Sequence, residues 1–150
     1  MELEKEIAQE KFKNAYHKLA VNLIYTSSWL RSFIFRQLKP RALSPEQFNI
    51  LRILRGQHPH PVTINLLIER MLDKMSNASR LVEKLRRKGL VKRQFNQADR
   101  RSVDVRILPK GLSLLKKLDR VENGWFEKLK TISIAEAKRA NQILDKLRGS

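Results

Sequence analysis

Residues 76–111 decide the fold of this chain, and they read SNASRLVEKLRRKGLVKRQFNQADRRSVDVRILPKG. The apolar positions first recur every three or four residues, which predicts a helix over residues 74–88. Beyond that helix they alternate with polar positions over 91–95 and again over 103–107, which predicts two half-buried strands. The polar stretch 96–101 joins the two strands as the tip of a hairpin.

The helix predicted over residues 74–88 has an apolar stripe and a polar face. We expect the stripe to be buried and to consist of Met75, Ala78, Leu81, Val82 and Leu85. The polar face consists of Lys74, Ser76, Asn77, Ser79, Arg80 and Lys84. A helix fits the major groove of DNA, where Arg and Lys reach guanine edges or phosphates and Asn pairs with adenine. Taken alone, such a face is equally well explained as a solvated helix surface.

Helices are predicted on both sides of this segment. Residues 1–40 have apolar residues at three- and four-residue steps, which predicts one long helix. Ser44 and Thr63 are suitable caps for two shorter helices, and the glutamine three residues after Ser44 completes a capping box. Helical periodicity returns after Pro109, with a new helix from about Ser133. The chain is therefore predicted to be mainly α-helical with a small β-hairpin.

Composition narrows the class of protein. The chain has 150 residues, about one domain, with 32 Lys or Arg against 15 Asp or Glu and a formal net charge of +17. The excess is greatest in residues 63–111, where thirteen basic residues stand against five acidic ones. Such a surface attracts a polyanion, and nucleic acid is the commonest one. Neither a membrane helix nor a secretion signal is evident, so we expect a cytoplasmic protein without a membrane partner.

Two short helices followed by a two-stranded ribbon with a charged tip have the layout of a winged helix-turn-helix. The tip carries Asp99, Arg100 and Arg101. An arginine at this place can enter a narrow minor groove, where the negative potential is enhanced. We expect Asp99 to hold one of the arginines by a salt bridge. An ordinary β-turn with charged residues is the alternative interpretation of the same three residues.

The motifs in this region resemble the MarR family of bacterial transcriptional regulators. The likeness is carried, in order, by Ser76–Leu85, Lys88–Val91, Asp99–Arg101 and Lys110–Gly111. It covers residues 44–111 by motif and the whole chain in helix order and length. One departure is Leu108, which stands where members of the family usually have a capping threonine. We expect packing of Leu108 to hold this junction in place of the missing cap.

The resemblance implies a homodimeric repressor of transcription that binds a pseudo-palindromic promoter site on double-stranded DNA. It implies that residues 41–111 form a winged helix-turn-helix lobe, with the helix over 74–88 in the major groove. It also implies that Arg100 or Arg101 enters the minor groove, and by its position we expect Arg101 to do so. Residues 1–40 and 112–150 would be the flanking dimerisation helices. The resemblance also implies a cleft for a small-molecule effector between those helices and the DNA-binding lobe.

Both ends of the chain carry apolar faces without a local partner, which favours dimerisation. The apolar residues concerned are Leu3, Ile7, Leu115, Leu118, Trp125, Ile143, Leu144 and Leu147. Packing of the two ends within one chain accounts for part of this surface. In the first helix, polar-tipped aromatic side chains suit a small aromatic or phenolic effector. The candidates are Tyr16, His17, Tyr25, Trp29 and Phe33, for which core or interface packing is the alternative.

Enzyme and metal chemistry find little support in the sequence. No glycine-rich phosphate loop, nucleophile elbow or paired-carboxylate motif is present. Cysteine is absent, and a zinc site would rest on His58 and His60, which Pro59 keeps from helical spacing. We therefore expect no catalytic residue, no metal and no cofactor. Two rival interpretations are an architectural or nonspecific DNA-binding protein without an effector, and a metal-dependent enzyme or sensor built on these histidines.

Overall fold

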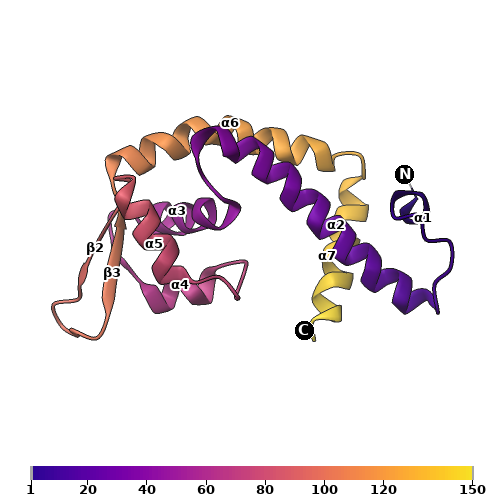
Figure 1. Ribbon diagram of the computed structural model, residues 1–150, viewed down its shortest axis with the longest axis horizontal. Helices are drawn as coiled ribbons and strands as arrows, with labels where there is room; N and C mark the ends of the chain where they lie inside the picture. Colours follow the sequence, from indigo (N-terminus) through magenta and orange to yellow (C-terminus); the bar gives the residue numbers. More distant parts are fainter. Residues whose placement is uncertain (1, 150) are drawn as a thin grey trace. The chain divides into compact units, whose positions relative to one another are not determined.

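The computed structural model describes residues 2–149 and is mainly helical with one small antiparallel sheet, as predicted (Figure 1). Its helices are α1 (Leu3–Glu6), α2 (Ala15–Leu38), the short 3-10 helix η1 (Lys39–Arg41), α3 (Pro45–Gln57), α4 (Ile64–Arg70), α5 (Ala78–Arg87), α6 (Pro109–Leu129) and α7 (Ile134–Leu147). Its strands are β1 (Val62–Thr63), β2 (Val91–Phe95) and β3 (Val103–Ile107). The chain divides into two compact units between Asn49 and Ile50.

The first forty residues do not form the single long helix that their periodicity predicts. α1 ends at Glu6, the backbone at Ala8 has a positive φ of 52°, and α2 begins only at Ala15. The second start is fixed by Asn14, whose side-chain oxygen accepts a hydrogen bond from the backbone N–H of His17 at 2.9 Å. Asn is a strong N-cap because this bond satisfies an otherwise unpaired donor of the first turn. The regular apolar spacing concealed this cap.

The predicted capping box at the start of α3 is present. The Ser44 hydroxyl accepts a hydrogen bond from the backbone N–H of Gln47 at 3.1 Å. In return, the side-chain oxygen of Gln47 accepts one from the backbone N–H of Ser44, also at 3.1 Å. Glu46, in the same turn, forms an ion pair with Arg31 of α2. The sequence therefore placed the beginning of this helix correctly.

The sheet of the second unit has three strands in the order β1-β3-β2, one more than predicted. β2 and β3 form the predicted antiparallel hairpin, in which Val91 lies opposite Ile107. β1 adds Val62 and Thr63 to the other edge of β3. A strand of two residues is too short to show alternation, so the sequence carried no signal for it. Thr63 also caps α4 as expected, because its hydroxyl accepts a hydrogen bond from the N–H of Leu66 at 3.2 Å.

The second unit buries apolar side chains from its helices and from the sheet. Its fully buried large side chains are Ile50, Leu51, Leu54, Val62, Leu67, Met71, Val82, Leu85, Val91, Leu115 and Leu118. Two ion pairs join α3 to α6, one between Arg52 and Glu122 and one between Arg55 and Asp119 at 2.8 Å. Phe95 departs from the predicted burial pattern of the strands, because 69% of it is exposed. β2 is thus packed only at its first residue.

A close contact fixes the start of α6 against the chain that follows α5. Gly111 lies in the first turn of α6, where a Cβ atom would stand 2.5 Å from the carbonyl oxygen of Leu90 and 2.7 Å from Cγ1 of Ile107. The backbone N–H of Leu108 donates a hydrogen bond to the same Leu90 carbonyl at 2.9 Å. Leu108 supplies no side-chain cap, as expected, and is itself half-buried. The junction therefore depends on backbone approach as well as on side-chain packing.

Only part of the predicted apolar patch at the chain ends is exposed. The members buried within this single chain are Leu3, Leu115, Leu118 and Trp125. For these four residues the prediction of an exposed patch is wrong, because they pack inside the protomer. Ile143 and Leu147 of α7 are exposed, and no residue of α7 is buried. Of the predicted patch, the residues that stay exposed in the second unit therefore lie on α7.

Candidate nucleic-acid interface

The helix predicted over residues 74–88 starts four residues later than expected. α5 begins at Ala78, so the residues before it form a turn. The carboxylate of Asp73 shapes this turn by accepting hydrogen bonds from the backbone N–H of Met75 and from the hydroxyl of Ser76, both at 3.0 Å. An Asp side chain that bonds to the backbone two residues later favours a turn over a helix. Met75 is 94% exposed, so its predicted place in the buried stripe is wrong.

The other four positions of the predicted apolar stripe are confirmed as the inward face of α5. Its inward face consists of Ala78, Leu81, Val82 and Leu85, of which Leu81 is half-buried and the others are buried. The helix is followed by Gly89, which has a φ of 70°, and the N–H of Leu90 donates a hydrogen bond to the carbonyl of Leu85 at 3.1 Å. This is the hydrogen-bond pattern of a glycine C-cap. The apolar face and the stop together fix which side of α5 is open.

The sequence predicted Asn77 on the polar face of the helix. In the structure Asn77 instead precedes the helix and is the N-cap of α5. Its side-chain oxygen accepts a hydrogen bond from the backbone N–H of Arg80 at 3.0 Å. Bidentate pairing with adenine uses the amide oxygen as well as the amide nitrogen. Such pairing would therefore share the oxygen that already accepts the cap hydrogen bond. In this structure the role of Asn77 is to start the helix.

We expect Asn77→Ala to lower the free energy of unfolding by about 1 kcal/mol, because the N–H of Arg80 loses its acceptor. Asn77→Asp keeps an acceptor at the same position and should retain the stability of the unsubstituted chain. Urea denaturation followed by circular dichroism measures both variants. Equal stability of Asn77→Ala and the unsubstituted chain would show that the cap contributes nothing.

Lys74 also lies before α5 and is already engaged. Its Nζ donates hydrogen bonds to the carbonyl oxygen of Ile68 at 3.3 Å and to that of Glu69. These carbonyls belong to the last turn of α4, where a lysine satisfies acceptors that the helix leaves open. Lys74 therefore caps the C-terminal end of α4 and does not lie on the polar face of α5, where the sequence had predicted it.

Ser79, Arg80 and Lys84 are exposed on α5, as predicted. Within residues 2–149, neither Arg80 nor Lys84 forms an ion pair with a carboxylate. Their positive charges are therefore available to phosphates or to base edges. Short polar side chains such as Ser79 allow close approach of the helix to a partner.

A neighbouring carboxylate, that of Glu83, forms ion pairs with three other arginines. It forms ion pairs with Arg86 at 2.8 Å and Arg87 at 3.2 Å on α5, and with Arg93 on β2 at 3.6 Å. The hydrogen bonds from Arg86 are the main cause that lowers the pKa of Glu83 from 4.5 to about 2. The cluster links α5 to β2 and partly neutralises these three positive charges.

The low pKa of Glu83 makes part of the fold's stability depend on pH. A carboxylate with a lower pKa in the folded chain stabilises it above about pH 4.5 and loses that contribution as the pH falls through about 2. We expect Glu83→Gln to be less stable than the unsubstituted chain near pH 6, and the difference to disappear towards pH 2. Thermal unfolding of both chains across this range checks it. A constant difference at all pH values would contradict the assignment.

Two side chains shape the tip of the wing between β2 and β3. The side-chain oxygen of Asn96 accepts hydrogen bonds from the backbone N–H groups of Ala98 and Asp99, and its amide nitrogen donates to the carboxylate of the buried Asp104 at 3.0 Å. The carboxylate of Asp99 accepts a hydrogen bond from the backbone N–H of Arg101 at 3.0 Å. No ion pair joins Asp99 to an arginine within residues 2–149, so the predicted salt bridge is wrong. Asp99 holds the backbone of the turn instead.

The wing tip leaves Arg100 and Arg101 exposed. A shallow cavity of about 570 Å³ lies beside them and is lined by Phe95, Asn96, Gln97 and Arg100. In Figure 1 the wing tip and the N-terminal end of α5 lie on the side of the second unit away from α6. The exposed cations of α5 and of the wing tip therefore belong to one unit, and none of them forms an ion pair with a carboxylate within residues 2–149. The residues Ser79, Arg80, Lys84, Arg100 and Arg101 are called the reading surface below.

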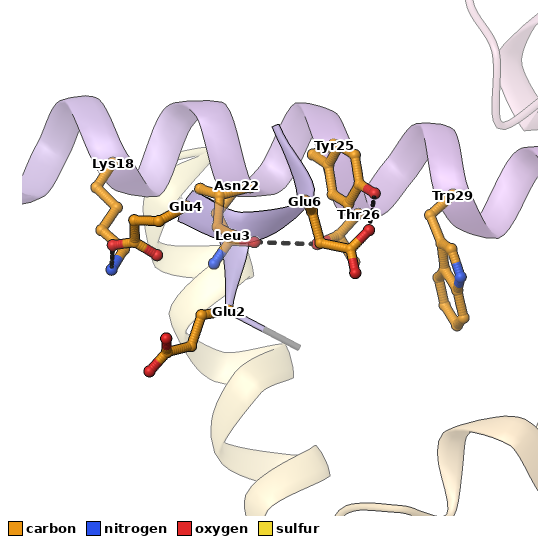
Figure 2. A pocket seen from close by; sticks show the side chains of 9 residues that line it. All are labelled: Glu2, Leu3, Glu4, Glu6, Lys18, Asn22, Tyr25, Thr26 and Trp29. Carbon is orange, nitrogen blue, oxygen red and sulfur yellow. Dashed lines mark hydrogen bonds and ion pairs between the residues drawn. The ribbon is translucent and has the colours of Figure 1, made fainter. Parts of the chain in front are cut away.

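Two of the five proposed effector residues share a cavity in the first unit. This cavity of about 460 Å³ is lined by residues of α1 and α2 and their flanks, among them Tyr25 and Trp29 (Figure 2). The Tyr25 hydroxyl donates a hydrogen bond to the carboxylate of Glu6 at 2.6 Å, which raises the pKa of Tyr25. Lys18 forms an ion pair with Glu4 at the other end of the same cavity. The lining combines an aromatic wall with paired charges.

The other three effector candidates are not brought to this cavity. Tyr16 is 83% exposed on α2. The ring of His17 packs edge-on against Phe12, and its Nδ1 accepts a hydrogen bond from the backbone N–H of Lys13 at 3.1 Å. Phe33 is half-buried but does not line the cavity. The five residues therefore do not form one site within the first unit.

Metal and membrane sites have no counterpart in the described part of the chain. Among residues 2–149, no three His, Cys, Asp or Glu side chains come together closely enough to hold a metal ion. His58 and His60 are both exposed. None of the helices in this range combines the length and apolar character needed to cross a bilayer.

Comparison with known protein families bears directly on this geometry. Residues 43–102 match the model of the MarR family. The chain carries a MarR-family winged-helix domain. The matched stretch of this MarR-family domain runs from the start of α3 to the end of the wing tip and includes α4 and α5. A comparison with curated protein sequences finds no match.

Solved structures extend the likeness beyond the MarR-family domain. A MarR transcription factor from Planctomyces limnophilus is 25% identical, with a TM-score of 0.69 over 90% of this chain and 98% of its own. S. aureus MepR in its complex with DNA is 19% identical in sequence, with a TM-score of 0.78 over 91% of this chain and 97% of its own. Bordetella bronchiseptica BpsR is 17% identical, with a TM-score of 0.80 over 93% of this chain and 99% of its own. The DNA binding of BpsR is regulated by 6-hydroxynicotinic acid.

Sequence reasoning missed two features of the MarR-family domain that the structure makes plain. Glu83 was not recognised as the partner of three arginines, although its spacing of three and four residues to Arg86 and Arg87 is the usual signal for helix ion pairs. The turn before α5 was also missed. The signal was available there in Asp73 and in Asn77, because both residue types bond to nearby backbone N–H groups.

Proposed function

We propose that this protein is a sequence-specific DNA-binding regulator of transcription. The observation that carries the proposal is the reading surface, in which exposed cations of α5 and of the wing tip stand without carboxylate partners in a single unit. In this proposal α5 enters the major groove with Ser79, Arg80 and Lys84 towards the bases. Arg101, with Arg100 beside it, enters the adjacent minor groove. The structural likeness to MepR in its DNA complex supports this mode of binding.

We assign to Ser76, Asn77 and Asp99 supporting roles in DNA binding. Their side chains bond locally, Ser76 to Asp73, Asn77 to the start of α5, and Asp99 to the wing backbone. They therefore fix where the reading surface lies. Contacts of their remaining polar atoms with phosphates are compatible with these bonds.

The regulator is proposed to act as a homodimer, in which residues 1–40 and 112–150 pair with a second copy and residues 41–111 form the DNA-binding lobe. The supporting observation is the exposed apolar surface at the end of the second unit. Its members are Phe126, Leu129, Ile132, Ile134, Ile143 and Leu147. A surface of this kind on one protomer marks an interface. A two-fold dimer would place two α5 helices about 34 Å apart, which matches half-sites one helical turn apart.

An effector of small aromatic or phenolic character is proposed to release the DNA, so that the protein acts as a repressor. The cavity lined by Tyr25 and Trp29 offers an aromatic wall and a hydroxyl for such a molecule. BpsR, whose DNA binding is regulated by an aromatic acid, shares the fold. A ligand shifts DNA affinity only by as much as its own affinity differs between the DNA-binding and released arrangements.

The proposal is tested first by selecting duplexes from a random pool with the purified full-length chain. We expect an inverted repeat whose half-site centres lie about 10 base pairs apart. The absence of any consensus would instead favour an architectural DNA-binding protein without an effector.

Arg101→Ala should weaken binding to the selected duplex and to unrelated duplexes about equally. A minor-groove arginine is attracted by the potential of the backbone more than by base identity. The slope of log affinity against log salt should fall by about 1. Arg120→Ala, which removes an equal charge from an exposed position on α6, is the matched control and should change the slope much less. Equal effects of the two substitutions on the salt slope would show that the wing does not contact DNA.

A further inference from the structure

The turn between α4 and α5 exposes two large apolar side chains that the DNA-binding proposal has not used. Met75 is 94% exposed and Leu72 is 88% exposed. Among the large hydrophobic side chains of residues 2–149 these are the two most exposed. The sequence had placed Met75 in the buried stripe of the helix, so its exposure is a finding of the structure. Exposing a large apolar side chain has a cost in water, which a partner surface can remove.

The exposed position of Met75 is held by the backbone around it. The carboxylate of Asp73 accepts a hydrogen bond from the Met75 N–H at 3.0 Å and another from the Ser76 hydroxyl. On either side of the turn, Met71 is 2% exposed and Ala78 is 3% exposed, so both ends are anchored in the core. These contacts therefore hold the turn so that Met75 stays exposed just before the N-terminus of α5.

The charges around this turn favour DNA over a second copy of the chain as the occupant. Three cations, Arg70, Lys74 and Arg80, are exposed within a few residues of Met75, against the two carboxylates of Glu69 and Asp73, so the local charge is net positive. Two such basic surfaces facing each other would repel, whereas a duplex carries one negative charge per 1.7 Å of its axis. An apolar side chain set among cations therefore suits an apolar group that is itself embedded in a polyanion.

The major groove contains one such group. Thymine carries a C5-methyl on its major-groove edge, and apolar side chains contact it. The unbranched thioether of Met can adapt to the position of a methyl group. We propose that Met75, assisted by Leu72, reads thymine methyl groups in the major groove at the N-terminal end of α5. This inference rests on the proposed DNA-binding function and adds a specificity determinant to it.

The test measures methyl recognition directly. In the duplex selected from the random pool, each thymine is replaced in turn by uracil, which lacks only the methyl group. The unsubstituted chain should lose about four-fold in affinity at one or two positions of each half-site, the factor expected for one buried methyl. Met75→Ala should bind the thymine duplex more weakly and should bind the thymine and uracil duplexes equally at one of those positions. Met75→Leu, which keeps an apolar side chain, should restore the difference.

The outcomes separate this inference from the function on which it rests. If the selected duplex is bound with preference but Met75→Ala and Leu72→Ala keep the full thymine–uracil difference, methyl reading by this turn is overturned and DNA recognition stands. If the unsubstituted chain shows no duplex preference, both proposals fail. If Met75→Ala instead changes the sedimentation of the free protein, the turn is a contact between copies, and the inference is overturned in that way. Loss of the thymine–uracil difference with unchanged sedimentation supports it.

Discussion

Gly111→Ala should lower the free energy of unfolding by about 3 kcal/mol, at the upper end of the cost of overpacking. The new Cβ would stand 2.5 Å from the carbonyl oxygen of Leu90 and 2.7 Å from Cγ1 of Ile107. The first of these atoms belongs to the backbone, which also accepts the hydrogen bond from Leu108 and so has little freedom to withdraw. Relief requires the start of α6 to move away from the end of the sheet.

Gly124→Ala is the matched control for this prediction. It introduces the same methyl group on the same helix, but nothing lies within 4 Å of the position that its Cβ would occupy. Alanine favours a helix over glycine by about 1 kcal/mol, so this variant should be more stable than the unsubstituted chain. Guanidinium denaturation of the two variants gives the comparison. Equal effects of the two substitutions would refute the tight junction at Gly111.

Arg80→Ala should reduce affinity for the selected duplex by about 10- to 100-fold and relax the preferred sequence at one or two base positions. Arg80 is exposed in the first turn of α5 and forms no ion pair with a carboxylate within residues 2–149. In the proposed orientation its guanidinium reaches a guanine edge, which arginine contacts in a bidentate manner. Affinities are compared at one fixed salt concentration because the electrostatic part varies steeply with salt.

Arg86→Ala is the charge-matched control for Arg80→Ala. It removes the same positive charge from the same helix, but Arg86 is bound to Glu83 by two hydrogen bonds at 2.9 Å and 2.8 Å. Without Arg86, Glu83 still forms ion pairs with Arg87 and Arg93. Because Arg86 is already paired, its loss should lower the affinity for the selected duplex by only a few-fold. A loss with Arg86→Ala as large as with Arg80→Ala would mean that net charge, and not the reading surface, governs binding.

The sequence predicted most of the fold because its main elements have regular periods and side-chain caps. Ser44, Thr63 and Ser133 each begin a helix as expected, and the structure shows the corresponding hydrogen bonds. Gly89 ends α5 close to the predicted end of the helix at residue 88, because its backbone has the positive φ that glycine adopts without strain. The alternation of apolar and polar residues likewise predicted the positions of β2 and β3.

The prediction failed where a short-range side-chain bond competes with the apolar period. Asn14 and Asn77 accept hydrogen bonds from backbone N–H groups three residues later and so start α2 and α5 later than the apolar spacing suggests. The same competition moved Met75 from the expected core to the surface. Burial of Trp125 could not be separated from exposure by sequence, because an interface and a core both select large apolar residues on one helix face.

The candidate site was predicted in its residue types better than in its geometry. Arg80, Lys84, Arg100 and Arg101 are exposed as expected. The partner of Asp99 was wrong because a sequence shows that a carboxylate is near an arginine but not whether the arginine's guanidinium or its backbone N–H is closer. Pairing of Arg93 on β2 with Glu83 on α5 depends on tertiary packing, which no local spacing encodes.

The ratio of two dissociation constants tests most directly whether this basic chain recognises a DNA sequence. The full-length protein is titrated with its selected duplex and with a scrambled duplex of equal length and composition, at about 0.15 M salt. Sequence recognition predicts a preference of about 1,000-fold or more for the selected duplex. Equal affinity for both duplexes, with a steep loss as salt rises, would contradict it and leave only the attraction of a cationic surface for phosphate.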